Sequence, residues 1–475
     1  MTTAMLRFTA LCMLVPVAAD VTGALAQAGG EAPTRRAMSQ AAGYKAQFTC
    51  SATFNAGKSR EAIDADELTN IYPDYAPAMA LLPDAAIDRR RKTVSVPYAE
   101  GMPPRTAVWR EHLGCASLPP GAEDRTIPPR VTIDMPRQQD VRARPWPDGD
   151  RVEETPLPAN TDAAKLQEAV EGAFGGDFGG VTSAVLVVKD GRIVAERYKE
   201  GFDLYTSQRT WSVAKSIGAT VIGAAIEAGF LDLQQPTGLE AWSEPGDPRA
   251  EITLENLLHM ASGLDSEPAG NRTDAIYFGG GLVTDHAAGN VLAAPPGKRW
   301  RYANNDTMLA LLTLRTAMDD DAAYLRFPFE TVLYPIGMRS TKLETDWQGN
   351  FILSSQVWTT SRDLARLGLL YLNDGVWNGD RVLPEGWAEY VATAAPAQPP
   401  GSERRPSRGY GAQFWLYQGY DGVPEGTYAA LGNRGQHVII VPEAQTVIVR
   451  RGYDYRGARF DGPAFTAAVL AAFAD

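Results

Sequence analysis

Ser212 and Lys215 stand three residues apart in segment 209–216, which the sequence predicts to open a helix. Residues three apart on a helix share a face, so the lysine amine can reach the serine hydroxyl. A serine hydroxyl is a poor nucleophile until a base removes its proton. The positive end of the helix dipole disfavours a charged lysine in the first turn, which favours a neutral amine there. This pair therefore predicts an enzyme that transfers acyl groups through a serine.

The same spacing also occurs in ordinary helices whose lysine faces water, so the accompanying residues decide. Tyr302 and Asn304 follow a turn-forming run, 294–300, that predicts a loop position for the tyrosine. A phenol there can relay a proton between Lys215 and a leaving group, and Asn304 can hold the lysine or a substrate amide. A second Tyr-x-Asn copy begins at Tyr371, but it lies in an amphipathic helix, where core packing explains it better.

A third candidate element lies near the C-terminus. Segment 429–441 is predicted to form a strand entered through glycines, followed by a turn at 442–445 and a second strand at 446–451. A backbone amide at Gln436, together with that of Ser212, would form the oxyanion hole that a tetrahedral intermediate needs. A plain antiparallel hairpin without a catalytic role is the alternative.

Three ordered motifs carry a resemblance to a known family: Ser212 with Lys215, Tyr302 with Asn304, and Gly435–Gln436. The chain resembles the class C β-lactamase-related serine hydrolases, most of all the 6-aminohexanoate-dimer hydrolases, from about residue 160 to the C-terminus. Segments 252–264 and 372–379 are similar to that family as well. The resemblance implies a β-lactamase/transpeptidase-like α+β fold, in which an antiparallel sheet flanked by helices and an all-helical insert enclose the active site between them.

One motif departs from the family pattern. Where β-lactamases carry Lys-Thr-Gly, the matching positions here are taken to be Asn433-Arg434-Gly435, which removes the usual lysine. Asn433 and Gly435 are predicted to contact the substrate, as are Asn304 and Tyr277, the latter beside the glycine-rich segment 278–284. Without the lysine, efficient penicillin hydrolysis is not expected. A small acyl ester or amide fits the site better, with no metal and no organic cofactor.

Other functions stay open from the sequence. A D-amino-acid peptidase or a penicillin-recognising enzyme of the cell wall would use the same residues, and a catalytically silent binding protein could keep the same fold. Two catalytic schemes find no support, because the chain contains neither a Gly-x-Ser-x-Gly nucleophile elbow nor a His-Glu-x-x-His zinc motif. A net charge of −12 without basic clusters argues against nucleic acid as a partner.

The N-terminus predicts export. An apolar core at 8–19 follows one positive charge, and small residues suited to cleavage occur up to position 28. Residues 1–28 therefore read as a signal peptide of a secreted or periplasmic protein, since the core is too short to span a membrane. After cleavage Cys50 and Cys115 remain, and the oxidising compartment predicts a disulfide between them.

The elements that must position the site follow from the rest of the chain. Residues 29–118 form a small N-terminal region closed by the cysteine pair, 119–158 a proline-rich linker that should run extended on the surface, and 159–475 the hydrolase domain. In that domain a helix at 162–174 and a hairpin at 183–198 precede a long helical middle, the C-terminal strands and a closing helix at 462–474. Strands at both ends with helices between them predict one antiparallel sheet flanked by helices. Three aromatic residues are possible cleft residues, with core packing the preferred interpretation: Trp211, Tyr410 and Trp415.

Overall fold

The structure is a computed structural model, and it describes residues 32–122, 128–134, 138–153, 156–266, 273–400, 409–417 and 419–473. The predicted signal peptide, residues 1–28, and the end of the predicted closing helix, Ala474, lie outside these residues. Within them, no helix has the length and apolar character needed to cross a membrane.

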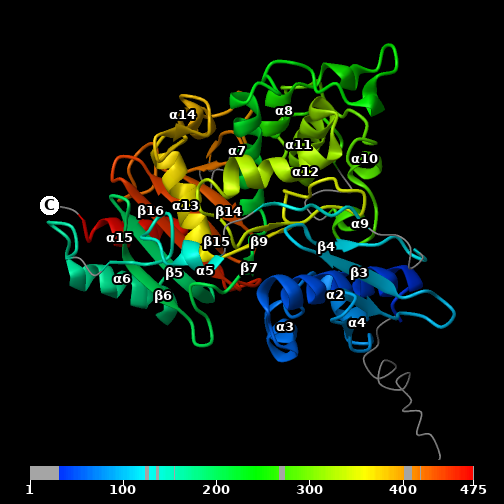
Figure 1. The fold of residues 1–475 in the computed structure, drawn as a ribbon, viewed down its shortest axis with the longest axis horizontal. Coiled ribbons are helices and arrows are strands. Elements are labelled where there is room, and N and C mark those ends of the chain that lie inside the picture. Colours follow the sequence, from blue (N-terminus) through cyan, green and yellow to red (C-terminus); the bar gives the residue numbers. More distant parts are fainter. Residues whose placement is uncertain are drawn as a thin grey trace, which may run out of the picture.

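A seven-stranded antiparallel sheet forms the centre of the hydrolase domain (Figure 1). Its order is β12-β13-β14-β15-β16-β5-β6. The C-terminal strand β16 pairs with the early strand β5, with Ile448 opposite Val187, so the two ends of the domain meet in the middle of the sheet as predicted. The strands are β5 Thr182–Lys189, β6 Arg192–Tyr198, β12 Gly409–Tyr410, β13 Trp415–Leu416, β14 Tyr428–Gly432, β15 Gln436–Val441 and β16 Thr446–Gly452.

Helices cover both faces of this sheet. Helices α6 (Ala163–Gly175) and α15 (Gly462–Leu470) pack on one face, whereas α13 (Ser361–Leu372) and α7 (Val213–Glu227) pack on the other. Strands covered on both sides bury side chains at every position, and β15 and β16 are buried throughout. Their apolar centres are flanked by buried polar side chains, such as Gln436 in β15 and Arg451 in β16. The predicted sheet flanked by helices is confirmed.

The segment between β6 and β12 holds most of the helices, as expected for the insert. It also contains a small sheet of order β7-β9-β8, which lies where the insert meets the N-terminal region, and a hairpin of β10 and β11. The insert is therefore not purely helical. Its elements are β7 Gln208–Arg209, α8 Leu254–Leu258, α9 Asp274–Tyr277, α10 Val283–His286, α11 Asn304–Met318, α12 Asp321–Phe327, β8 Lys342–Leu343, β9 Val357–Thr359, β10 Val376–Trp377, β11 Asp380–Arg381 and α14 Trp387–Ala392.

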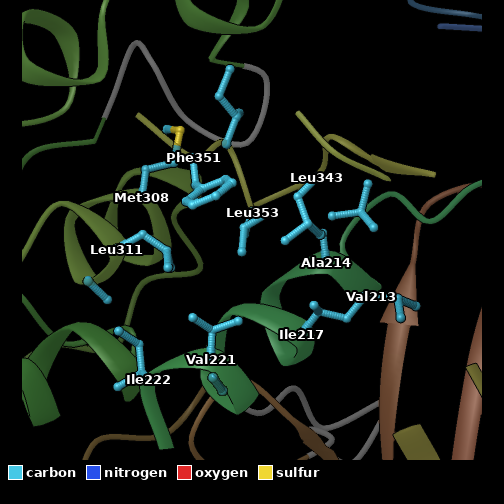
Figure 2. Packing of buried hydrophobic residues seen from close by; sticks show 14 of the residues in the cluster. Val213, Ala214, Ile217, Val221, Ile222, Met308, Leu311, Leu343, Phe351 and Leu353 are labelled. Carbon is cyan, nitrogen blue, oxygen red and sulfur yellow. The ribbon is translucent and has the colours of Figure 1, made fainter. Parts of the chain in front are cut away.

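Helix α7 is buried on all sides from its first turn to Ala225. Its apolar side chains pack against Met308 and Leu311 of α11 and against a wall that includes Phe351 (Figure 2). Gly218 lets the two helices approach closely, because a Cβ atom there would lie 3.1 Å from Thr307 Cγ2. A helix that is apolar all round is stable only inside a core, so the tertiary fold holds its N-terminal end in one position.

The N-terminal region is a helix packed on a four-stranded antiparallel sheet of order β1-β2-β3-β4. The predicted disulfide between Cys50 and Cys115 is present and joins α2 to β4. The buried side chains of this region are continuous with the core of the hydrolase domain, so the two parts share one core. The elements are α2 Arg35–Ala56, α3 Arg60–Asp66, α4 Ala76–Met79, β1 Ala86–Asp88, β2 Thr93–Val96, β3 Arg105–Arg110 and β4 Gly114–Ser117.

Glu344 links the two parts by polar contacts. Its fully buried carboxylate accepts hydrogen bonds from Ser51 Oγ at 2.5 Å, Asn55 Nδ2 at 3.0 Å, Gln47 Nε2 at 3.1 Å and the Cys115 amide at 3.1 Å. Burial raises the pKa of Glu344 to about 6, although the bonds from Ser51 and Cys115 offset part of the rise. One acidic side chain from the hydrolase domain thus gathers four donors of the N-terminal region at the junction.

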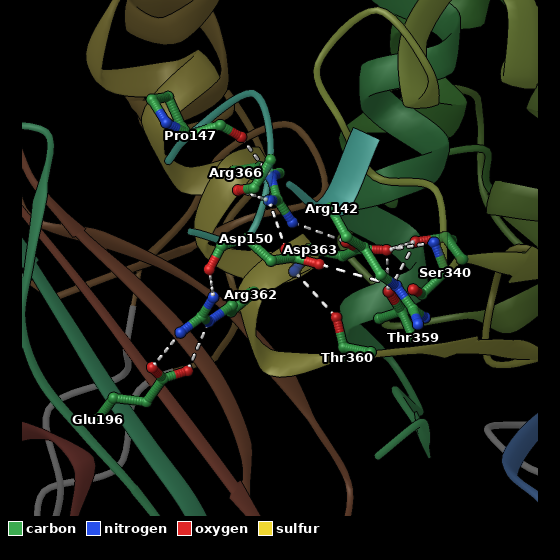
Figure 3. Close-up of polar contacts among 12 residues, drawn as sticks. Arg142, Pro147, Asp150, Glu196, Ser340, Thr359, Thr360, Arg362, Asp363 and Arg366 are labelled. Atoms are coloured by element: carbon green, nitrogen blue, oxygen red, sulfur yellow. Dashed lines mark hydrogen bonds and ion pairs between the residues drawn. The ribbon is translucent and has the colours of Figure 1, made fainter. Parts of the chain in front are cut away.

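The predicted linker is pinned to the hydrolase domain. Arg366 of α13 donates to the carbonyl oxygens of Pro147 and Gly149 at 2.7 and 2.6 Å and to Asp150 Oδ1 at 2.9 Å (Figure 3). Arg362, one turn earlier, binds Glu196 through two hydrogen bonds of 2.8 and 2.6 Å. The linker also contains a short helix, α5 (Gln138–Arg142), that its proline content did not predict. Backbone carbonyls left free by an irregular segment are satisfied here by guanidinium donors.

Candidate active site

Ser212 lies at the N-cap position of α7, where the chain turns from β7 into the helix. The turn uses a left-handed backbone at Trp211, whose φ is 51°, an uncommon conformation for a bulky residue. The Trp211 ring is held by the Arg209 guanidinium, 3.6 Å from its centroid. This conformation leaves Ser212 half-buried, with its side chain at the wall of a cavity.

Lys215 lies beneath the serine and is almost fully buried. Its Nζ is 3.3 Å from Ser212 Oγ, and it donates to Asn304 Oδ1 at 2.6 Å and to the Ser354 carbonyl oxygen at 2.8 Å. Burial lowers the pKa of Lys215 to about 7. Within the described part of the chain no carboxylate pairs with this amine, so nothing restores its ordinary basicity. A large fraction of Lys215 is therefore neutral near pH 7.

Tyr302 lies in the loop before α11, as predicted, and its ring centroid is 4.9 Å from Lys215 Nζ. Burial raises the pKa of Tyr302 to about 12, while hydrogen bonding with the side chains of Ser212 and Trp415 offsets part of the rise. The phenol keeps its proton at neutral pH. Three groups that exchange protons thus meet at one point: a hydroxyl, an amine that titrates near neutrality and a protonated phenol.

These groups open into a cavity of about 370 Å³. We call it the reacting chamber. Of the described residues, those that line it are all uncharged, and most are aromatic or small polar side chains: Tyr72, Trp211, Ser212, Tyr277, Tyr302, Asn304, Ser355, Trp415, Leu431, Gly432 and Asn433.

The hairpin beside Ser212 differs from the prediction. Segment 429–441 forms two strands, β14 and β15, joined by a turn in which Arg434 and Gly435 have positive φ values of 58° and 75°. Residues 433–435 therefore form a turn. They do not form the strand segment that the sequence analysis matched to the Lys-Thr-Gly motif. Glycine adopts this backbone at position 435 without strain, whereas Arg434 adopts a left-handed conformation that is uncommon for a residue with a side chain.

This hairpin moves the predicted oxyanion donor. Gln436 lies inside the sheet opposite Gly432, and its side chain donates to the carbonyl oxygens of Arg434 and Gly452. It does not line the reacting chamber, whereas Gly432 and Asn433 do. A Cβ atom on Gly432 would lie 3.2 Å from the Ser212 amide nitrogen, so only glycine lets β14 approach the nucleophile this closely.

The remaining predicted contact residues divide between the chamber and its surroundings. Tyr277 lines the chamber and its hydroxyl is 2.7 Å from Ser354 Oγ. Asn304 bridges Lys215 and Thr273, to whose Oγ1 its Nδ2 donates at 2.8 Å. Gly435 does not line the reacting chamber; it faces a neighbouring cavity together with Asn433.

The aromatic residues that the sequence analysis considered are found partly in the chamber wall and partly in the core. Trp211 and Trp415 line the chamber, although core packing was the preferred interpretation for both. Tyr410 is buried behind them, with its ring 5.0 Å from that of Trp415, and Tyr371 is a core residue bonded to Thr220, as expected for both.

Five described residues of the site were not predicted as site residues by the sequence analysis: Tyr72, Ser354, Ser355, Leu431 and Gly432. Ser354 and Ser355 come from the segment between β8 and β9, which carries no recognisable motif, and Ser355 Oγ accepts from Arg209 at 2.9 Å. Tyr72 comes from the N-terminal region, more than a hundred residues before the nucleophile. Gly432 was the sequence signal that could have been used, because a glycine at the end of a strand often marks a place where another backbone approaches closely.

The beta-lactamase family model matches residues 166–451 of this chain, well over half of its length. The chain belongs to the beta-lactamase family. Membership confirms the predicted fold and the predicted class of enzyme, a serine hydrolase. Residues before 166, including Tyr72 and the whole N-terminal region, lie outside the match.

Individual relatives agree with this placement. The 6-aminohexanoate-dimer hydrolase of Paenarthrobacter ureafaciens is 24% identical over 298 residues, which cover 57% of this chain and 72% of that protein. Among solved structures, EstCE1, a hydrolase with promiscuous acyltransferase activity, is similar with a TM-score of 0.52 and 17% identity over 66% of this chain and 99% of that one. A penicillin-binding protein homologue from Caulobacter crescentus has a TM-score of 0.51 and 16% identity over 67% and 99% of the two chains. These structural likenesses show the fold.

Proposed function

We propose that this protein hydrolyses an ester or amide of a small acyl compound through an acyl-enzyme on Ser212. One observation carries the proposal: an amine with no carboxylate partner among the described residues, whose pKa burial lowers to about 7, lies 3.3 Å from a serine hydroxyl at the wall of a cavity whose described lining is uncharged. A neutral amine at that distance can take the hydroxyl proton as the oxygen attacks a carbonyl carbon.

The protonation states suggest how the work is divided. Lys215 changes its charge near pH 7, so it acts as the base that activates Ser212. Tyr302 keeps its proton until about pH 12, so it acts as the donor to the departing alcohol or amine and regains a proton from Lys215. Water then attacks the acyl-enzyme, with Lys215 again as the base. Because the two groups exchange one proton, their titrations are coupled.

The oxyanion needs two donors, and strand geometry favours the amides of Ser212 and Asn433. The Tyr417 amide donates to the Thr427 carbonyl oxygen across the outer edge of β14. Amides alternate in direction along a strand, so odd-numbered residues from Thr427 onward face away from β15. Beyond the short strand β13 this edge faces Ser212, which supports the amide of Asn433, the residue directly after β14, as the second donor in place of that of Gln436.

Labelling of the active site tests the proposal. Incubation of the mature protein with a fluorophosphonate should modify Ser212, as located by peptide mapping, and Ser212→Ala should abolish the label. The same preparations are then assayed with p-nitrophenyl butyrate, a D-alanyl-D-alanine peptide and a chromogenic cephalosporin. We expect turnover of the ester. Turnover of the peptide alone would support a D-amino-acid peptidase, and silence on all three without a label would support a binding protein.

We also propose that the protein is exported. The disulfide between Cys50 and Cys115 supports an oxidising compartment, and the apolar N-terminal segment has the pattern of a signal peptide. N-terminal sequencing of protein recovered from the periplasm or medium should begin just after residue 26 or 28. Recovery of the chain in the cytoplasm with Met1 intact would contradict export.

A further inference from the structure

A second cavity adjoins the reacting chamber. It has a volume of about 490 Å³ and shares a wall of five residues with that chamber: Tyr72, Trp211, Leu431, Gly432 and Asn433. We call it the second chamber. Ile71 and Phe460 give it an apolar part. A substrate bound with its carbonyl at Ser212 can therefore extend past Tyr72 and Asn433 into a second space.

The second chamber differs from the first in charge. Three arginines line it: Arg434, which is buried, and Arg456 and Arg459, which are exposed. Arg434 donates to the carbonyl oxygens of Asp66 and Asp454, which do not neutralise its charge. In the part of the chain that the structure describes, none of the three forms an ion pair with a carboxylate.

The one carboxylate in the wall is already engaged. Asp454 Oδ1 accepts from Arg450 at 2.9 Å and from the Val181 amide at 2.8 Å, and its Oδ2 accepts from the Phe460 amide at 3.1 Å. Its charge is balanced by Arg450, so the three arginines leave the chamber positive in a protein whose net charge is −12.

Most of the residues that distinguish this chamber lie outside the family match. Asn70 and Ile71 precede residue 166, and Arg456 and Arg459 follow residue 451. The chamber is thus bordered by the N-terminal region and by the segment that follows β16, with the β14–β15 hairpin as the part that lies within the family match.

We propose that the second chamber binds the carboxylate end of an elongated acyl substrate whose scissile carbonyl lies at Ser212. The proposal rests on the proposed function and narrows its substrate class to compounds with a negatively charged end. Guanidinium groups bind carboxylates through charge-assisted hydrogen bonds, and two exposed arginines at a rim attract anions from solution. The apolar side chains beside them suit the carbon chain that joins the two ends.

Matched esters test this assignment. The rate constant kcat/KM is measured for p-nitrophenyl monoesters of succinic, adipic and suberic acid and for the neutral p-nitrophenyl butyrate, hexanoate and octanoate. A second pair, phenyl butyrate with and without a carboxylate on the phenyl ring, places the charge on the leaving group. We expect the charged member to be favoured by about fivefold at the best chain length, since exposed ion pairs contribute about 1 kcal/mol at most, and the preference to fall with added salt.

The variant Arg456→Ala/Arg459→Ala should bring the ratio of charged to neutral substrate towards one. Arg35→Ala/Arg36→Ala, which removes the same charge from the exposed start of α2 outside both chambers, should keep the wild-type ratio. If the neutral esters are hydrolysed but the ratio of kcat/KM for charged to neutral substrate is at or below one for every acyl pair and for the leaving-group pair, this proposal is overturned. The proposed function then stays intact. Failure of Ser212 to label, with no ester hydrolysed, would overturn both.

Discussion

Two buried ionisable groups can be compared: Lys215 in the candidate active site and Glu344 at the junction with the N-terminal region. Burial affects both in the same way, but their surroundings differ. Burial shifts the pKa of each towards its neutral form, to about 7 for the lysine and about 6 for the glutamate. Glu344 is surrounded by four donors and touches neither chamber. Lys215 lies against a half-exposed hydroxyl, which its neutral form can deprotonate under the proposed function. The two groups therefore differ in the side chains around them and not in their burial.

The largest expected effect is on the catalytic side of this comparison. Lys215→Ala should lower the rate of fluorophosphonate labelling and kcat/KM for an ester by about a thousandfold or more, because Ser212 loses its base. Lys215→Arg should be equally slow, since a guanidinium stays protonated at neutral pH. Lys165→Ala, at an exposed position of α6, is the control and should retain full activity. Fast labelling of Lys215→Ala in a folded protein would mean that another group activates the serine.

At the junction the expected effect is on folding. Glu344→Ala removes the acceptor of four donors, among them the buried Ser51 hydroxyl and the buried Cys115 amide, so the free energy of unfolding should fall by about 3 kcal/mol. Urea denaturation followed by circular dichroism measures it, and Glu168→Ala, exposed on α6, should change it by less than about 0.5 kcal/mol. An unchanged free energy of unfolding for Glu344→Ala would contradict this expectation and would show that water replaces the carboxylate as acceptor without loss of stability.

The pH dependence of stability sharpens the same contrast. The folded-state pKa of Glu344, about 6, lies above its ordinary value of 4.5, so the folded state holds the proton more tightly. The resulting stabilisation is complete below pH 4.5 and is lost as the pH rises through 6; a difference of about 1.5 in pKa corresponds to about 2 kcal/mol. Relative to Glu344→Gln, which cannot titrate, the wild type should therefore lose about 2 kcal/mol between pH 4 and pH 7. A constant difference between the two proteins would place the pKa of Glu344 at its ordinary value.

The smallest of the four effects concerns the pH dependence of activity. Because Lys215 must be neutral to act as base and its pKa is about 7, kcat/KM for a neutral ester should rise with pH up to about 7 and then level off. Below the midpoint the rate should fall tenfold for each pH unit, after correction for spontaneous hydrolysis. A profile that keeps rising to pH 10 would indicate a lysine with ordinary basicity, and then the comparison with Glu344 would fail.

Local pattern predicted the parts of the site that lie close together in the chain. Ser212 and Lys215 share a helix face, so their contact follows from helical spacing alone. Tyr302 also lies in a loop, as the turn-forming run before it predicted, and Asn304 begins helix α11, which the sequence analysis did not predict. The sequence did not predict the hairpin, because the residues from Asn433 to Gly435 suit both the entrance to a strand and a turn. Which of the two they form determines whether Gln436 or Asn433 lies near Ser212.

By itself, the sequence predicted the contact between Ser212 and Lys215, the family, the disulfide and a sheet flanked by helices. The first follows from local helical spacing, the family from ordered motifs, the disulfide from the number of cysteines in an exported chain, and the sheet from the apolar pattern of its strands. Only the tertiary structure decided that Tyr72 lines the same cavity as Ser212, and that Arg456 and Arg459 line the cavity next to it. Tyr72 reaches Ser212, more than a hundred positions later in the chain, because the N-terminal region and the hydrolase domain share one core. Such proximity is a result of packing, which periodicity along a single chain does not encode.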